Sequence, residues 1–246
     1  MFRGGNYNWL NEGLSQLDIH ICGYTVNSGR IVPWAIDGQL TDYLTHCNQS
    51  AVPMDGNEYF SQQTQYGNGF LFFLYLYEHY EPGIGRRIYA AADTGLTDYI
   101  QIIEKATGEP FEHTYIKFAI ANYVDGIYKP EESDLFADWF HYDTVDLRGT
   151  VNLATGTVVL PGVRTGIFPE AGSYPIEDIH RSVFPWGTDY LKLGFGTYSE
   201  MNYDPSAPPD LSVTFYTDRH FNIFLLPVSY NEAINKVEVT PGVTID

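Results

Sequence analysis

An apolar run in the first third of the chain constrains the fold more than any other feature. Residues 70–77 read Phe-Leu-Phe-Phe-Leu-Tyr-Leu-Tyr, and Glu-Pro-Gly follows at 81–83. Proline and glycine at that place end a helix, so the pattern predicts a helix over 67–80. Its stripe of Phe70, Phe73, Leu74 and Tyr77 is expected to face the core. The run is shorter than the apolar stretch of about eighteen residues that a membrane-spanning helix needs.

Further segments of the first half have helical spacing or helix boundary residues. Residues 7–22 place Leu10, Leu14, Leu17 and Ile21 on one stripe, with Asn6 or Asn8 as a cap. Helices are also expected at 38–46, 86–92, 97–107 and 110–123. Short turns with glycine join the later ones, which predicts an up-and-down helical array.

The pattern of apolar and polar residues changes near residue 130. A polar break, Lys-Pro-Glu-Glu-Ser-Asp at 129–134, precedes short alternating runs between turn residues, a pattern typical of strands. Seven such runs predict a β-sandwich of about 100 residues. The expected strands are 144–153, 157–160, 163–168, 189–195, 211–216, 222–227 and 236–240.

These patterns assign the chain to the α+β class, with helices first and strands after. A chain of 246 residues that is 44% hydrophobic is long enough for two domains. We expect a helical domain over 1–140 and an all-β sandwich over 141–246. The boundary is expected between Asp138 and Asp146.

Two short motifs in the helical part indicate a chemistry. Trp-Leu-Asn-Glu-Gly at 9–13 resembles the motif that supplies the third zinc ligand in gluzincin metallopeptidases, of the hyicolysin type and the related aminopeptidase N type. Tyr-Gly-Asn-Gly at 66–69 resembles the Tyr-x-x-Gly that begins a helix in the same families, but it lacks the Glu-Lys pair of the aminopeptidases. The resemblance covers residues 1–140 and implies a helical region like the C-terminal subdomain of those enzymes. It implies that Glu12 is a metal ligand and that Tyr66 donates a hydrogen bond to the oxyanion of the reaction.

The other half of the family's zinc site does not occur in this sequence. In the family, a helix about eighteen residues earlier carries His-Glu-x-x-His, whose two histidines share one helix face. Eleven residues precede Glu12, and none of the seven histidines pairs at that spacing. We therefore expect the C-terminal portion of a zinc-dependent metallopeptidase-like protein, a truncated hydrolase or pseudoenzyme that is inactive alone. Zinc is the cofactor of the complete family site, and this chain alone is expected to bind none.

Charge and targeting features narrow the partners. The formal net charge is −18, with 18 acids against 7 bases in residues 1–140 and 13 against 6 in residues 141–246. Such a surface disfavours nucleic acid and anionic membranes as partners. A peptide or protein substrate fits the family. The start of the sequence does not resemble a signal peptide, so the chain is either cytoplasmic or cut from a longer precursor; the resemblance implies a secreted or cell-surface protein.

The two cysteines leave alternatives open. A bridge between Cys22 and Cys47 would close a loop of about 25 residues and stabilise the fold by roughly 3–4 kcal/mol. Two buried free thiols are equally consistent with the sequence. His20 and His46 lie beside these cysteines in sequence, so the four side chains are a further candidate zinc site.

Two other functions are compatible with the sequence. One is a non-catalytic secreted or surface binding module in which an aromatic cleft holds a peptide or glycan; the content of 20 tyrosines and 15 phenylalanines suits such a cleft. The other is an unrelated helical protein with a sandwich, in which Glu12 is only a solvent-facing residue of a first helical turn. A glycosidase needs two carboxylates at a set distance, and nothing in the sequence selects a pair.

Overall fold

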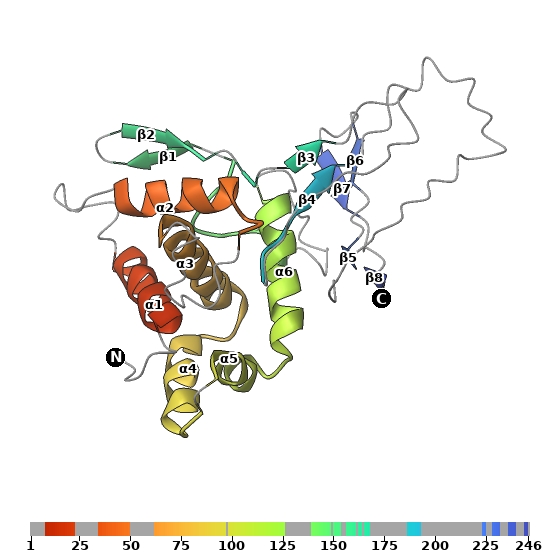
Figure 1. Cartoon of the computed structure of the whole chain (residues 1–246). Helices are drawn as coiled ribbons and strands as arrows, with labels where there is room; N and C mark the ends of the chain where they lie inside the picture. Colours follow the sequence, from red (N-terminus) through yellow and green to blue (C-terminus); the bar gives the residue numbers. More distant parts are fainter. Residues whose placement is uncertain are drawn as a thin grey trace, which may run out of the picture. The chain divides into compact units, whose positions relative to one another are not determined.

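The structure is a computed structural model (Figure 1). Contacts divide the chain into two compact units: Met1–Gly166 with Arg181–Tyr190, and Ile167–His180 with Leu191–Asp246. The predicted division between residues 140 and 141 stays a prediction. The structure describes residues 8–22, 34–49, 62–96, 98–125, 139–148, 150–153, 156–160, 162–163, 165–167, 186–192, 223–224, 228–231, 236–239 and 244–245.

Helix α3, Gln62–His79, is the most deeply buried element of the first unit. Helices α1, Asn8–Ile21, and α2, Trp34–Thr45, both pack on it (Figure 1). The predicted helix over 67–80 is confirmed, but the expected core stripe was too narrow. Residues 67–76 are all buried, whereas Tyr77 is 45% exposed. A helix segment that is apolar all round has to be covered on every side. Residues 67–76 of α3 are covered in this way.

The remaining predicted helices are present with shifted ends. They are α4, Ile84–Asp93, α5, Tyr99–Thr107, and α6, Phe111–Val124. Local chemistry explains the ends of α5, because the Asp98 carboxylate accepts from the Ile100 N–H at 3.0 Å and Gly108 adopts φ 82° after the last turn. Helix α2 begins at Trp34, and α3 begins at Gln62, earlier than the sequence predicted.

The predicted all-β sandwich, and with it the α+β class, is wrong. In the part of the chain that the structure describes, strands pair only in twos, whereas a sandwich needs two larger sheets. A repeated strand pattern shows where strands form but not which strands pair. The pairs are β1, Thr150–Leu153, with β2, Gly156–Val159; β3, Thr165–Ile167, with β4, Tyr190–Lys192; β5, Ile223–Phe224, with β8, Thr244–Ile245; and β6, Val228–Asn231, with β7, Lys236–Val239.

The predicted strands have mixed outcomes. The run at 211–216 lies outside the described residues. Of the run at 144–153, only the last four residues form a strand. The segment 139–148 belongs instead to the helical unit, where carboxylates hold its backbone. Asp125 accepts from the N–H groups of Tyr142 at 3.0 Å and Leu147 at 2.7 Å.

Glu78, near the end of α3, holds the same segment from another side. Its carboxylate accepts from the N–H groups of Asp143 at 2.9 Å and Thr144 at 3.1 Å, and from the Thr144 hydroxyl at 2.5 Å. His20 of α1 lies 3.0 Å from that hydroxyl. Segment 139–148 is thus fixed to α1, to α3 and to the end of α6.

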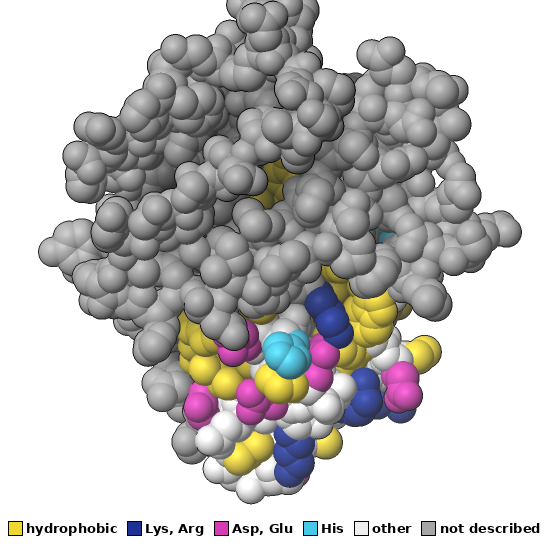
Figure 2. Space-filling view, turned by 90° about the vertical axis from the view of Figure 1, so that its right-hand side faces the viewer, with side chains coloured by type: hydrophobic (Ala, Val, Ile, Leu, Met, Phe, Trp, Pro, Cys, Tyr) yellow, Lys and Arg dark blue, Asp and Glu magenta, His cyan; other side chains and the backbone are white. Residues whose placement is uncertain are grey.

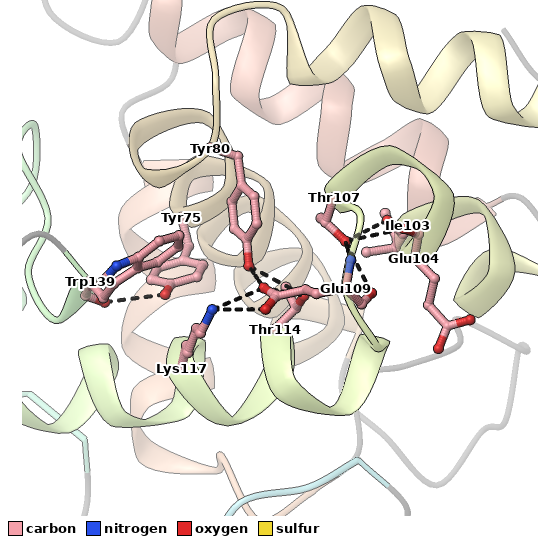
Figure 3. A network of polar contacts seen from close by, with 9 residues as sticks. All are labelled: Tyr75, Tyr80, Ile103, Glu104, Thr107, Glu109, Thr114, Lys117 and Trp139. Carbon is pink, nitrogen blue, oxygen red and sulfur yellow. Dashed lines mark hydrogen bonds and ion pairs between the residues drawn. The ribbon is translucent and has the colours of Figure 1, made fainter. Parts of the chain in front are cut away.

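A polar network fixes the start of the same segment (Figure 3). Glu109 accepts from the hydroxyl groups of Tyr80 and Thr114 and pairs with the Lys117 ammonium at 2.8 Å. The ammonium lies 4.2 Å from the centre of the Trp139 ring. Burial alone would raise the pKa of Glu109, but Lys117 and Tyr80 lower it overall.

The surface features are consistent with a folded, mixed-charge unit. No helix among the described residues is long and apolar enough to cross a membrane. In the described part of the face in Figure 2, acidic, basic and apolar side chains are interspersed. The net negative charge of the chain is therefore not gathered on that part of the face.

Candidate functional site

Glu12 is the fifth residue of α1, one turn beyond its start. Its side chain is partly exposed, while the neighbours Gly13 and Leu14 are buried. The residue therefore lies at the edge of the core and not within it. The first turn of α1 contains no acidic residue, so the position is not the dipole-stabilised first turn of the alternative interpretation.

Tyr66 is the fifth residue of α3 and is also partly exposed. Burial raises the pKa of its hydroxyl, and the Glu12 carboxylate raises it further. A carboxylate has this effect only from nearby, because solvent screens more distant charges. The two helices that carry these residues, although far apart in sequence, pack on each other.

The contact between α1 and α3 explains where the two side chains lie. The Cα of Gly13 lies 3.4 Å from the position that a Cβ of Gly69 would take. Successive residues of a helix are about 100° apart, so Tyr66, three residues before Gly69, lies about 60° around α3 from it. Tyr66 therefore projects at the edge of the face that α1 covers, and Glu12 precedes the contacting glycine of α1.

We expect replacement of Glu12 by glutamine to lower the pKa of Tyr66. The glutamine side chain has a similar size but no charge, so the part of the shift due to charge disappears and the part due to burial remains. NMR titration of protein labelled at tyrosine Cζ measures this, with Tyr66→Phe to assign the signal. Asp18→Asn, an exposed change on the same helix, is the matched control and should leave the Tyr66 titration unchanged. An unchanged pKa in Glu12→Gln would show that the two groups are not neighbours.

The described residues do not make a zinc site by themselves. Among them, no three His, Cys, Asp or Glu side chains come together in a way that fits a metal ion. Zinc takes three protein ligands in catalytic sites and four in structural ones, so Glu12 alone does not fit the ion. No reaction step through a metal follows from this chain's residues.

The other candidate zinc site, His20, Cys22, His46 and Cys47, does not form. His20 contacts Thr144, and His46 lies 3.4 Å from the Asp42 carboxylate. Cys22 is exposed and Cys47 is buried, and no disulfide joins them.

Several carboxylates that the sequence could not sort have structural partners. Glu78 binds segment 139–148, as described above. Glu104 accepts from the Phe111 N–H at 3.1 Å, and Glu81 lies 3.5 Å from the Arg87 guanidinium. The sequence gives no sign of the Glu78 and Asp125 contacts, because their partners lie 17 to 66 residues away.

Trp186 has an unusual backbone. Its φ of 58° is the one positive value found for a non-glycine residue in the described ranges. Its carbonyl accepts from the Tyr115 hydroxyl at 2.5 Å, and its ring lies 4.8 Å from that of Phe111. The tryptophan therefore anchors a turn on α6.

Comparison of the chain with models of protein families, with curated proteins and with solved structures finds no match. The function is therefore inferred from the two motifs and the packing of the helices that carry them.

Proposed function

We propose that this chain supplies part of the active site of a zinc metallopeptidase of the gluzincin type. Glu12 is one zinc ligand, and Tyr66 donates a hydrogen bond to the oxyanion. The observation that carries the proposal is the packing of α1 on α3 at Gly13 and Gly69, which sets Glu12 and Tyr66, from separate motifs, beside the same helix contact. Groups that act on one reacting centre have to lie around one place.

The ionisation of Tyr66 suits a donor. An oxyanion is stabilised by a group that still carries its proton when negative charge develops. Burial and the Glu12 carboxylate both raise the pKa of Tyr66 above the ordinary value of 10.0. The hydroxyl therefore keeps its proton throughout the neutral range, where a peptidase would need it.

We place the metal's remaining ligands outside the residues that the structure describes. The chain has no His-Glu-x-x-His, and the described residues offer no substitute near Glu12. When bound, zinc supplies an acidified water and polarises the substrate carbonyl. Glu12 would be one ligand of the metal, and the Tyr66 hydroxyl would donate a hydrogen bond to the oxyanion. The family resemblance further suggests a secreted or cell-surface protein acting on peptides or proteins.

The gene provides the first test. The DNA upstream of the Met1 codon should encode an in-frame His-Glu-x-x-His about eighteen residues before Glu12, at the spacing of the two motifs in the family. An in-frame stop codon upstream of Met1, with a ribosome-binding site directly before the Met1 codon, would contradict the proposal for a single polypeptide. A separate chain with the histidine motif that purifies with this one would rescue it.

Zinc and activity measurements on the whole gene product provide the second. We expect the isolated 246-residue chain to retain no stoichiometric zinc after dialysis. In the whole product, Glu12→Gln should lose zinc, whereas Tyr66→Phe should keep zinc and lower kcat by about 10²–10³, as loss of one oxyanion donor does. Asp18→Asn, exposed on α1, is the matched control and should change neither. Peptide binding without cleavage or zinc would instead identify a binding module.

A further inference from the structure

Each of the two candidate side chains is followed at once by a glycine that has no room for a side chain. A Cβ on Gly13 would lie 2.2 Å from Cδ2 of Phe73 and 3.0 Å from the Gly69 carbonyl oxygen. A Cβ on Gly67 would lie 2.1 Å from the Gln39 carbonyl oxygen. Real Cβ atoms do not approach other atoms this closely, so both positions require glycine while the helices keep their spacing.

The requirement does not apply to every helical glycine of this unit. A Cβ on Gly38 of α2 or on Gly85 of α4 would meet nothing within 4 Å. A Cβ on Gly69 would have its nearest neighbour at 3.4 Å, which is ordinary contact. Among the described helical glycines, the close approaches therefore occur at the two that follow Glu12 and Tyr66.

The two contacts join three helices in series. Gly13 brings α1 against α3, and Gly67 brings α3 against α2. A residue that precedes a contacting glycine is turned by about 100° from the contact, at the rim of the interface. Both Glu12 and Tyr66 are partly exposed, as this rim position requires. Small residues at such contacts let two helix backbones approach closely and fix their relative height.

We propose that Gly13 and Gly67 are positioning residues that set the separation between the Glu12 carboxylate and the Tyr66 hydroxyl. Gly13 sets how closely α1 packs on α3, and Gly67 sets how closely the first turns of α3 pack on α2. The importance of this separation for a reaction rests on the proposed function. The separation itself is a property of the folded chain and is measurable without metal or substrate.

The test measures how strongly Glu12 influences Tyr66 in variants of each glycine. The readout is the fall in the Tyr66 pKa that Glu12→Gln causes, followed by NMR of labelled tyrosine. In Gly13→Ala the methyl has to move from 2.2 Å to an ordinary contact of 3.4 Å or more, which displaces α1. Charge interactions weaken with distance, so the fall should be smaller than in the wild type. Gly67→Ala, which displaces the first turns of α3, should also alter it.

Gly38→Ala and Gly85→Ala are the matched controls. They make the same chemical change in helices of the same unit but touch nothing. Both should leave the fall in the Tyr66 pKa at its wild-type size. Gly69→Ala, which makes only ordinary contact, should do so too. A merely structural effect of lost glycine flexibility would appear in all five variants alike.

A rescue variant covers the case in which Gly13→Ala does not fold. Replacing Phe73 by valine removes both ring atoms that the methyl would meet, Cδ2 at 2.2 Å and Cε2 at 2.5 Å, and leaves the close approach to the Gly69 carbonyl oxygen at 3.0 Å. Gly13→Ala in the Phe73→Val background should then fold and show a smaller fall than Phe73→Val alone. An equal fall in the two would overturn the proposal.

The outcome separates the two proposals. If Gly13→Ala and Gly67→Ala fold and leave the influence of Glu12 on Tyr66 unchanged, the positioning role is wrong whatever the chain does. If the influence changes as expected but the whole gene product binds no zinc and cleaves no peptide, positioning stands and the metallopeptidase proposal fails.

Discussion

Replacing Phe72 by alanine is expected to cost about 3–5 kcal/mol of the free energy of unfolding of the helical unit. Phe72 is fully buried in α3, where its ring lies against aromatic rings of α1 and α6. Its ring centre lies 5.1 Å from that of Trp9 on α1 and 5.2 and 5.8 Å from those of Phe118 and Phe111 on α6. Alanine would leave a cavity that several rigid helices border, so little relaxation is available to fill it.

Urea unfolding followed by tryptophan fluorescence measures this loss. All four tryptophans lie within the first compact unit, so the signal reports that unit alone. Tyr77→Ala, an aromatic truncation on the same helix at a side chain that is 45% exposed, is the matched control and should cost less than about 1 kcal/mol. Equal losses in the two variants would mean that the core is not centred on this face of α3.

The helices could be predicted because their signals are local. Apolar spacing located α1, and the Glu-Pro-Gly sequence marked the end of α3. The start of α3 could not be read, because Tyr-Gly-Asn-Gly looks like a helix start. In the structure Gly67 and Gly69 lie inside the helix, where they allow α2 and α1 to approach. Whether a glycine breaks a helix or packs it depends on what lies against it, which a single sequence does not state.

The strands show the converse limit. Alternation marked most of the runs that form strands, but the partner of each strand is a matter of long-range contact. A sandwich was expected from seven regularly spaced runs, and the described strands instead pair in twos, three of the four pairs being antiparallel ladders of two to four residues. A two-stranded pair buries little surface, so it indicates neither a second sheet nor a shared core.

The candidate site could be predicted only in part. The motif resemblance selected Glu12 and Tyr66, and the structure places both beside the contact between α1 and α3. No rule of spacing connects residues 12 and 66, so their proximity required the packing of α1 on α3. The carboxylates that hold segment 139–148 had no sequence signature at all, and that segment was predicted to be the start of a strand domain.

Replacing Asp125 by alanine is the second change expected to have a large effect. The side chain is only 3% exposed and accepts two backbone hydrogen bonds, from Tyr142 and Leu147. Alanine leaves both N–H groups without their acceptor, and a buried unpaired donor costs about 1–3 kcal/mol. The expected loss is therefore about 2–5 kcal/mol in the same urea assay. Leu147 is fully buried, and its amide donates to the Asp125 carboxylate. In Asp125→Ala this amide should become accessible to hydrogen exchange.

Asparagine at the same position should give an intermediate loss. Its one carbonyl oxygen replaces one acceptor, while its amide nitrogen turns a donor toward the second N–H group. Asp18→Ala, an exposed acid on α1, is the control for the loss of one negative charge and should stay within about 0.5 kcal/mol of the wild type. If Asp125→Ala costs no more than this control, the carboxylate does not hold segment 139–148.

The pH dependence of that loss has a definite sign. Burial raises the pKa of Asp125 above its ordinary value of 3.8, and the two N–H bonds oppose only part of the rise. Between 3.8 and the raised value, the folded protein binds more protons at this site than the unfolded chain does. The stabilisation due to this proton is complete below pH 3.8 and disappears as the pH rises through the folded pKa. Alanine has no such proton, so the cost of Asp125→Ala should be larger near pH 4 than at pH 7. A cost that instead grows from pH 4 to pH 7 would mean that the hydrogen bonds, and not burial, determine the ionisation of Asp125.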